Sequence, residues 1–135
     1  MSANKERFQK LNVSAETTIK LRTLKARTGL TPNITARLGL AMSLDEPGRP
    51  NPATFATDGM EFNSYTLLGP YSSVIEALLR QRLHEDGADP DQPLSEALRA
   101  HVNRGVSLVY PRIKAIENLA DLLPRADGSE GASNG

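Results

Sequence analysis

The chain contains no cysteine and only two histidines among its 135 residues. Without cysteine it can form no disulfide framework, no thiolate nucleophile and no cysteine-ligated metal site. His84 and His101 lie in different segments, and neither belongs to an HxxxH-type pair, so we expect no first-row metal site. The sequence therefore predicts a protein without a metal or other cofactor.

Long apolar runs are also missing. No run reaches the roughly 20 apolar residues that a membrane span needs, and the N-terminus, MSANKERFQK, is polar and charged, unlike a signal peptide. We expect a cytoplasmic protein that does not associate with a membrane. By length, residues 1–123 form a single domain with a core large enough to fold, and the small, polar residues 124–135 form a disordered tail.

The sequence has no Walker A motif, no GxGxxG and no zinc-deaminase signature, and nothing places an activated hydroxyl beside a histidine. For His101 a structural role on its helix is favoured over catalysis. Glu61 is a lone carboxylate, for which a structural hydrogen bond is favoured over general acid or base catalysis. The acidic turn 85–93 does not have the spacing of an EF-hand loop, which favours a solvated loop. We therefore expect no catalytic and no metal-binding residue.

Charge is distributed unevenly along a chain whose formal net charge is zero. Residues 1–44 hold eight basic and two acidic groups, a net charge of +6, and the remaining residues hold eight basic and fourteen acidic groups, a net charge of −6. The asymmetry indicates an N-terminal half that meets a polyanion. The alternative is a pair of solvated faces that neutralise each other between subunits.

The segment 23–44 predicts the end of one helix, a break and a second helix. Ser14 is expected to cap the first helix, which runs to about Thr28, and Gly29 can take the left-handed conformation that closes it. The Thr31 side chain is expected to cap a second helix from Thr31 to Leu44, and Pro32 fits its first turn. That second helix is apolar on nearly all sides, so it must be covered, in part by another copy of the chain.

Residues 7–13 show a weak period of two, which is typical of a short strand. So short a strand cannot form a stable sheet alone, so we expect it to pair with a copy of itself or to lie as an arm. The first helix has two apolar faces about 180° apart, with Leu21 and Leu24 on one and Ile19 and Ala26 on the other. Two apolar faces favour an oligomer, although a deep core within one chain is the alternative.

Beyond the helix pair, residues 45–63 form a long irregular connection that Phe55, Met60 and Phe62 pin to the core, and the apolar residues 65–71 end in a turn. Three further helices are expected.

A capping box of Ser73 and Glu76 opens the first of them, which runs to about His84 with these side chains facing inward: Val74, Ile75, Leu78, Leu79 and Leu83. The second begins at Pro93 and passes Val102; Gly105 weakens it, and Pro111 kinks or restarts it. The last is an amphipathic helix with the apolar residues Ile113, Ile116, Leu119, Leu122 and Leu123.

The predicted fold is therefore mainly α: a short N-terminal strand or arm, a ribbon–helix–helix-like helix pair and about three further helices, in an oligomer. In ribbon–helix–helix proteins two short strands pair and can enter the DNA major groove. The amides of Thr31, Asn33 and Ile34, at the N-terminus of the second helix, would bind a phosphate. The candidate DNA-binding residues are Lys10, Asn12, Lys20, Arg22, Lys25, Arg27, Thr31, Asn33 and Arg37. The alternative is that most of these residues only solubilise the surface, and that Arg37 is a structural ion-pair partner.

Three segments resemble the DndE proteins of bacterial DNA sulfur modification, in which sulfur replaces a non-bridging phosphate oxygen of the DNA backbone. They are residues 24–44 (LKARTGLTPNITARLGLAMSL), 60–71 (MEFNSYTLLGPY) and 101–109 (HVNRGVSLV), and the resemblance covers about residues 8–123. It implies a small, mostly helical subunit, expected to be a homotetramer, that binds double-stranded DNA with a preference for nicked DNA. It also implies partners, namely the ATP-pyrophosphatase-like and ATPase subunits of the modification complex and a cysteine desulfurase.

The sequence departs from the family pattern in two ways. The family's lysine-rich surface holds more arginine here, and Ala36 stands where the family usually has a cysteine, which excludes any role for that thiol. We expect a DNA-binding, non-catalytic subunit. The alternatives are a DNA-nicking enzyme that uses Glu61, Asn63 or Tyr65, and an adaptor whose basic half binds an acidic partner protein.

Overall fold

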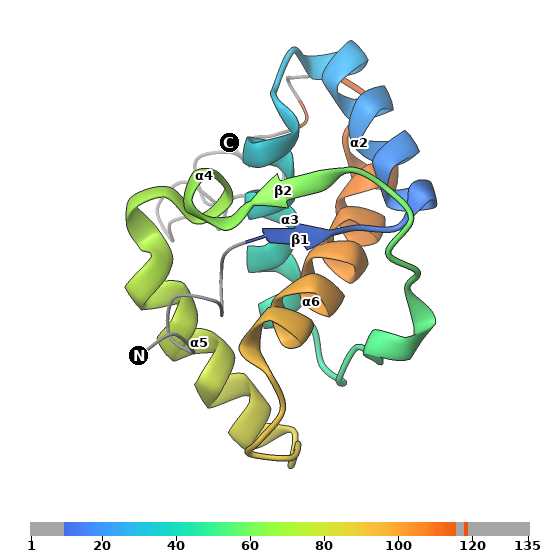
Figure 1. Cartoon of the computed structure of the whole chain (residues 1–135). Coiled ribbons are helices and arrows are strands. Elements are labelled where there is room, and N and C mark those ends of the chain that lie inside the picture. Colours follow the sequence, from blue (N-terminus) through green and yellow to red (C-terminus); the bar gives the residue numbers. More distant parts are fainter. Residues whose placement is uncertain (1–9, 116–117, 119–135) are drawn as a thin grey trace, which may run out of the picture.

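The computed structural model describes residues 10–115 and residue 118, and within them it is mainly helical with one two-stranded sheet (Figure 1). The short N-terminal strand, the helix pair and the further helices make the fold mainly α, as predicted. The strands and α-helices are β1 (Lys10–Asn12), α2 (Ala15–Thr28), α3 (Pro32–Asp45), β2 (Glu61–Asn63), α4 (Ser64–Leu68), α5 (Ser72–Glu85) and α6 (Leu94–Val109). Short 3₁₀ turns are η1 (Pro52–Thr54), η2 (Gly69–Tyr71) and η3 (Tyr110–Arg112).

The break between α2 and α3 is largely as predicted. The Ser14 side chain accepts a hydrogen bond from the Thr17 amide, and Gly29, at φ 80°, donates its amide to the Lys25 carbonyl. Pro32 occupies the first turn of α3. The predicted side-chain cap from Thr31 is wrong: its hydroxyl makes no capping bond, although Thr31 does stand at the N-cap position.

The prediction that the N-terminal strand pairs with a second copy of itself is wrong in this structure. β1 pairs antiparallel with β2 of the same chain, with Leu11 opposite Phe62. Both side chains are buried in the main core, so burial on this face sets the register. The connection after α3 supplies the partner strand. The pairing is extended beyond β1 by the Val13 amide, which donates to the Met60 carbonyl at 3.1 Å.

Helices α3 and α6 form the centre of the molecule and cross at two glycines (Figure 1). A Cβ on Gly39 would lie 2.8 Å from the backbone carbon of Gly105 and 2.8 Å from the Val106 nitrogen, closer than real Cβ contacts come. The prediction that Gly105 weakens the helix is therefore wrong. Glycine lets the two backbones touch, and α6 continues without interruption to Val109, with Pro111 in the 3₁₀ turn that follows.

Helix α5 departs from the prediction at its start and on one face. It begins at Ser72 directly after the 3₁₀ turn η2, and no side chain caps it, so the predicted capping box does not form. Ile75 and Leu79 are buried, whereas Val74 is 59% and Leu78 is 49% exposed. The prediction that Val74 and Leu78 face inward is therefore wrong: both side chains lie on the surface of the single chain.

Two segments were incompletely predicted. The apolar stretch before α5 contains a five-residue helix, α4, which the Asn63 side chain caps by accepting from the Tyr65 and Thr66 amides. In the long connection, Phe62 is buried and Met60 packs against the core, as expected, while Phe55 is half-buried. The predicted last helix, apart from its first three residues and Asn118, and the predicted tail 124–135 lie outside the described residues. Among the described helices, none has the length and apolar character to cross a membrane.

Candidate nucleic-acid interface

Helix α2 carries most of the predicted DNA-binding side chains. Arg22, Lys25 and Arg27 are exposed, and within the described residues none of the three makes a hydrogen bond or an ion pair. From Thr17 to Leu44 the sequence has no acidic residue. These three side chains therefore present positive charge that no carboxylate of the described residues pairs with.

Two cations of this helix, two turns apart on one face, lie over one aromatic ring. Tyr110, in η3, has the Lys20 ammonium 5.9 Å and the Arg27 guanidinium carbon 5.3 Å from its ring centroid, which is cation–π distance. Lys20 also lies 3.4 Å from the Ser107 hydroxyl and 3.9 Å from a Glu16 carboxylate oxygen. Lys20 and Arg27 therefore sit side by side against the segment that follows α6. Sequence reasoning did not identify Tyr110.

The arginines between residues 45 and 104 differ from those of α2 because each is bound within the chain. Arg49 donates to Gln92, Arg80 pairs with Glu76 at 3.1 Å, Arg82 pairs with Asp86 at 3.1 Å, Arg99 donates to the Phe55 and Pro52 carbonyls, and Arg104 donates to Ser43, Glu46 and Gly48. These guanidiniums hold loops and helix ends in place. The contrast makes α2 the better candidate for binding an external anion.

The strand residues of the predicted site lie apart from this cluster. Lys10 pairs with Glu61 across the sheet at 3.4 Å, and the Asn12 side chain donates to the Gly59 carbonyl at 3.2 Å. Both residues line an open pocket of about 370 Å³ beside the start of α6, together with Arg99. The structure thus separates β1 from the cations of α2, and both β1 side chains already have partners.

Arg37 is bound inside the molecule. Its Nε donates to the Leu67 carbonyl at 2.8 Å and its Nη2 to the Thr66 carbonyl at 3.2 Å, and its guanidinium lies 5.6 Å from the Tyr71 ring centroid. The predicted alternative of a structural role fits this geometry, although the partners are backbone carbonyls and a ring rather than a carboxylate. Arg37 joins α3 to the end of α4.

The N-terminus of α3 offers less to a phosphate than predicted. The Ile34 and Thr35 amides both donate to the Thr31 carbonyl, at 3.1 and 3.2 Å. Pro32 has no amide proton. The prediction that Ile34 supplies a free amide is therefore wrong, and Thr31 and Asn33 remain the candidates at this corner, next to the end of α2.

A buried serine–histidine pair lies near the C-terminal end of α3. The Ser43 hydroxyl is 2.8 Å from Nδ1 of His101, and Arg104 Nε donates to the same hydroxyl at 2.9 Å. Burial, helped by the charges of Arg104 and Arg82, lowers the pKa of His101 to about 4. His101 is therefore neutral near pH 7, and its Nδ1 shares a hydrogen bond with the Ser43 hydroxyl. Ser43 is 0% and His101 2% exposed, so no substrate reaches the pair, and its role is structural, as predicted for His101.

Two of the three residues considered for strand cleavage are also engaged. Glu61 pairs with Lys10, and Asn63 caps α4, while the Tyr65 ring is exposed. No group of three His, Cys, Asp or Glu side chains in the described part of the chain is arranged to hold a metal ion.

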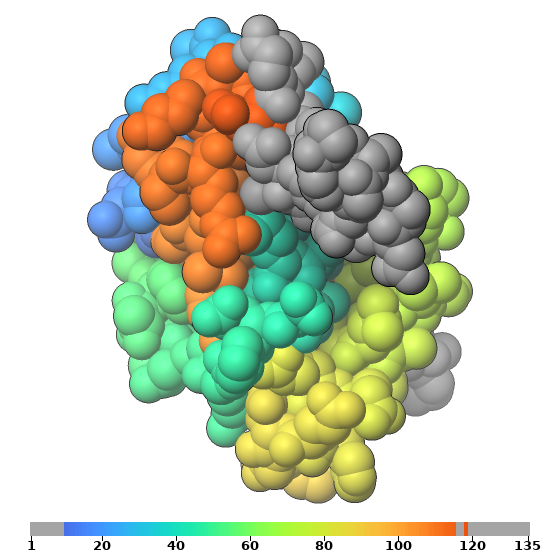
Figure 2. All heavy atoms as spheres, turned by 180° about the vertical axis from the view of Figure 1, so that it is seen from behind, coloured from blue at the N-terminus to red at the C-terminus, as the bar shows by residue number. Residues whose placement is uncertain are grey.

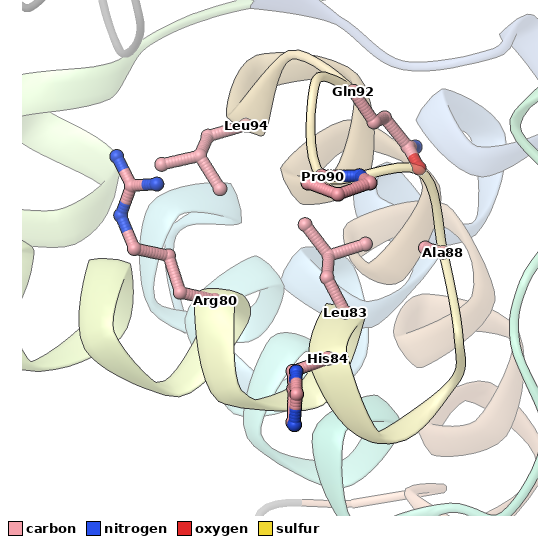
Figure 3. A pocket seen from close by; sticks show the side chains of 7 residues that line it. All are labelled: Arg80, Leu83, His84, Ala88, Pro90, Gln92 and Leu94. Atoms are coloured by element: carbon pink, nitrogen blue, oxygen red, sulfur yellow. The ribbon is translucent and has the colours of Figure 1, made fainter.

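A second pocket, of about 180 Å³, lies between the end of α5 and the acidic turn. It is lined by Arg80 and His84 together with Leu83 and Leu94 (Figure 3). Neither pocket is lined by both a hydroxyl group and a histidine.

The fold and its surface define a small, mainly helical protein with an intramolecular two-stranded sheet and an unneutralised basic helix. The family model described as "DNA sulphur modification protein DndE" matches residues 10–116, and the chain belongs to the DndE family. This confirms the resemblance seen in the sequence.

Two solved structures are similar to the chain. The crystal structure of DndE from Escherichia coli B7A, involved in DNA phosphorothioation modification, has 29% identity and a TM-score of 0.62, covering 75% of this chain and 95% of that one. The DndE G21/24K mutant, involved in DNA phosphorothioation, has 27% identity and a TM-score of 0.60, covering 75% and 96%. No curated protein gave a significant match to the sequence.

Proposed function

We propose that this DndE-family protein is a DNA-binding, non-catalytic subunit of the bacterial DNA phosphorothioation machinery. It contacts the backbone of double-stranded DNA and prefers nicked duplexes. The observation that carries the proposal is the exposed set of cations on α2, Arg22, Lys25 and Arg27, which have no polar partner among the described residues. Family membership supplies the biological setting.

Phosphate binding is the chemistry that this surface supports best. Guanidinium and ammonium groups that already have carboxylate partners gain little from a phosphate, whereas free ones release counterions from DNA when they bind. Contacts of this kind position a duplex without reading its bases. Binding by α2 is therefore expected to depend steeply on salt and weakly on sequence.

The protein acts as a homo-oligomer, expected to be a tetramer, in this proposal. Helix α2 exposes Ile19 (62%) on its outer side, and Tyr71, Val74 and Leu78 form an exposed apolar stripe at helical spacing that runs from η2 into α5. Exposed apolar stripes of this kind are typical of surfaces that pack against protein. The other subunits of the modification complex are the further partners of the proposal.

The test compares binding to intact and singly nicked duplexes of one sequence, at several salt concentrations, with a gel check for strand cleavage. We expect a steep salt dependence, tighter binding to the nicked duplex and no new strand ends. New nicks in the intact duplex, absent with Glu61→Ala, would make the protein a nicking enzyme. Tight binding to a partner subunit without DNA binding at low salt would make it an adaptor. Either result contradicts the proposal.

A further inference from the structure

Two cations outside α2 resemble Arg22 and Lys25 in having no polar partner in the described part of the chain. Arg112, at the end of η3, and Lys114, two residues later, are exposed, and neither side chain makes a hydrogen bond or ion pair within the described residues. From Arg104 to Ala115 the sequence contains no acidic residue. This short segment is therefore locally basic, although the half of the chain that contains it is acidic overall.

The fold places this segment beside α2. The two elements are in contact, and both views show the C-terminal end of α6 and the turn after it, in orange, next to the blue helix (Figures 1 and 2). Tyr110 forms the link, because its ring has Lys20 and Arg27 within 5.9 and 5.3 Å of its centroid. Cations far apart in sequence therefore share one end of the molecule.

The Tyr110 ring is held firmly enough to position its neighbours. It packs against the small apolar cluster of Leu24, Val109 and Ile113, all buried. Lys20 is oriented further by the Ser107 hydroxyl at 3.4 Å. A fixed ring that attracts two long, flexible side chains reduces the entropy that they lose when they bind an anion.

We propose that Tyr110, Arg112 and Lys114 extend the phosphate-binding surface of α2. Arg112 and Lys114 bind DNA phosphates directly, and Tyr110 is a positioning residue that holds Lys20 and Arg27 on the same face. The inference rests on the proposed function, since it requires that the protein bind duplex DNA. It adds a contribution from the C-terminal half of the chain, whose net charge of −6 alone would not predict phosphate binding.

The first test removes the two cations. The variant is Arg112→Ala/Lys114→Ala, and the measured quantity is the slope of log K against log salt concentration for binding to a nicked duplex. The slope is expected to become shallower by about 0.9 for each phosphate that the variant no longer neutralises, or about 1.8 in all. The matched control is Arg49→Ala/Arg80→Ala, which removes the same charge from exposed side chains engaged with Gln92 and Glu76. The control keeps the parental slope.

The second test separates positioning from packing at Tyr110. Tyr110→Phe keeps the ring face and is expected to bind with parental affinity and slope. Tyr110→Leu keeps apolar volume but removes the ring, and its slope is expected to be shallower at unchanged secondary structure by circular dichroism. A folded Tyr110→Leu protein with the parental slope would overturn the positioning role. If that variant does not fold, Tyr110→Met, which also removes the ring at similar apolar volume, takes its place in this test.

The outcomes distinguish this inference from the proposed function. A parent protein that binds no duplex at low salt overturns the proposed function and with it the inference. A parent that binds, with a slope that becomes shallower for Arg22→Ala/Lys25→Ala but not for Arg112→Ala/Lys114→Ala, overturns the inference alone. A shallower slope for both double variants and not for the control supports it.

Discussion

Gly39 and Gly105 bring the backbones of α3 and α6 into direct contact, and the Gly105 main chain occupies the space that a side chain on Gly39 would need. The crossing lies at the centre of the molecule and sets the position of α6 relative to the helix pair. Through η3, it also determines where Tyr110 meets α2. The geometry of the basic surface therefore depends on two residues that carry no side chain.

Gly105→Ala is expected to destabilise the protein by about 1–3 kcal/mol, or to prevent folding, because the added methyl group overlaps the Gly39 backbone. Intrinsic propensity predicts the opposite sign, since alanine in a helix interior is more favourable than glycine by about 1 kcal/mol. The measurement is the midpoint of urea unfolding. A variant at least as stable as the parent would contradict the close crossing.

The buried His101 predicts a loss of stability on acidification. Its pKa is lowered from 6.5 to about 4 in the folded protein, so below pH 6.5 the unfolded state binds more protons than the folded state. The free energy of unfolding is therefore expected to fall as the pH drops from about 6.5 to 4, by a total on the order of 3 kcal/mol. His101→Gln lacks this contribution, so the parent should lose more stability than the variant over this range in urea titrations. Equal losses would contradict the assignment.

Arg37 is expected to contribute to stability and not to DNA binding. Arg37→Ala leaves the Leu67 and Thr66 carbonyls without their donors and should cost about 1–2 kcal/mol in urea unfolding. Arg37→Lys should recover little, because a single ammonium cannot reproduce the two guanidinium bonds. The salt slope of DNA binding should stay parental for either folded variant. A slope reduced by about 0.9 would return Arg37 to the phosphate-binding residues.

The exposed stripe on α5 predicts an effect on assembly. Val74→Glu places a charge in the centre of the stripe, and we expect the molar mass measured by light scattering to fall toward that of the monomer. Ser73→Glu is the matched control, because Ser73 is exposed on the same helix outside the stripe, and it should leave the mass unchanged. An unchanged mass for Val74→Glu would exclude this stripe from the subunit interface.

Signals that are local in the sequence predicted the corresponding structure well. Ser14, Gly29 and Pro32 fix the ends of α2 and α3 through contacts within a few residues, and both helices form nearly as expected. The pairing of Leu11 with Phe62 was not predictable in this way, because a short strand shows its own pattern but not its partner. Gly105 was misread for the same reason: only the crossing with Gly39 explains it.

The candidate site was predicted in part. The sequence identifies the cations of α2, but charge alone does not distinguish them from arginines such as Arg37, whose partners are backbone carbonyls of a distant helix. Tyr110 carried no signal in the sequence, since its importance arises from the packing of η3 against α2. The predicted contributions of Lys10 and Asn12 to DNA binding stay predictions.

The central claim is that α2 binds the DNA backbone, and the salt dependence of duplex binding tests it most directly. For the parent and for Lys25→Ala/Arg27→Ala, the association constant with one nicked duplex is measured from low to physiological salt. The account predicts weaker binding by the variant and a slope of log K against log salt that is shallower by about 1.8, or about 0.9 for each of the two cations removed. Equal affinity and equal slope for the two proteins would contradict it.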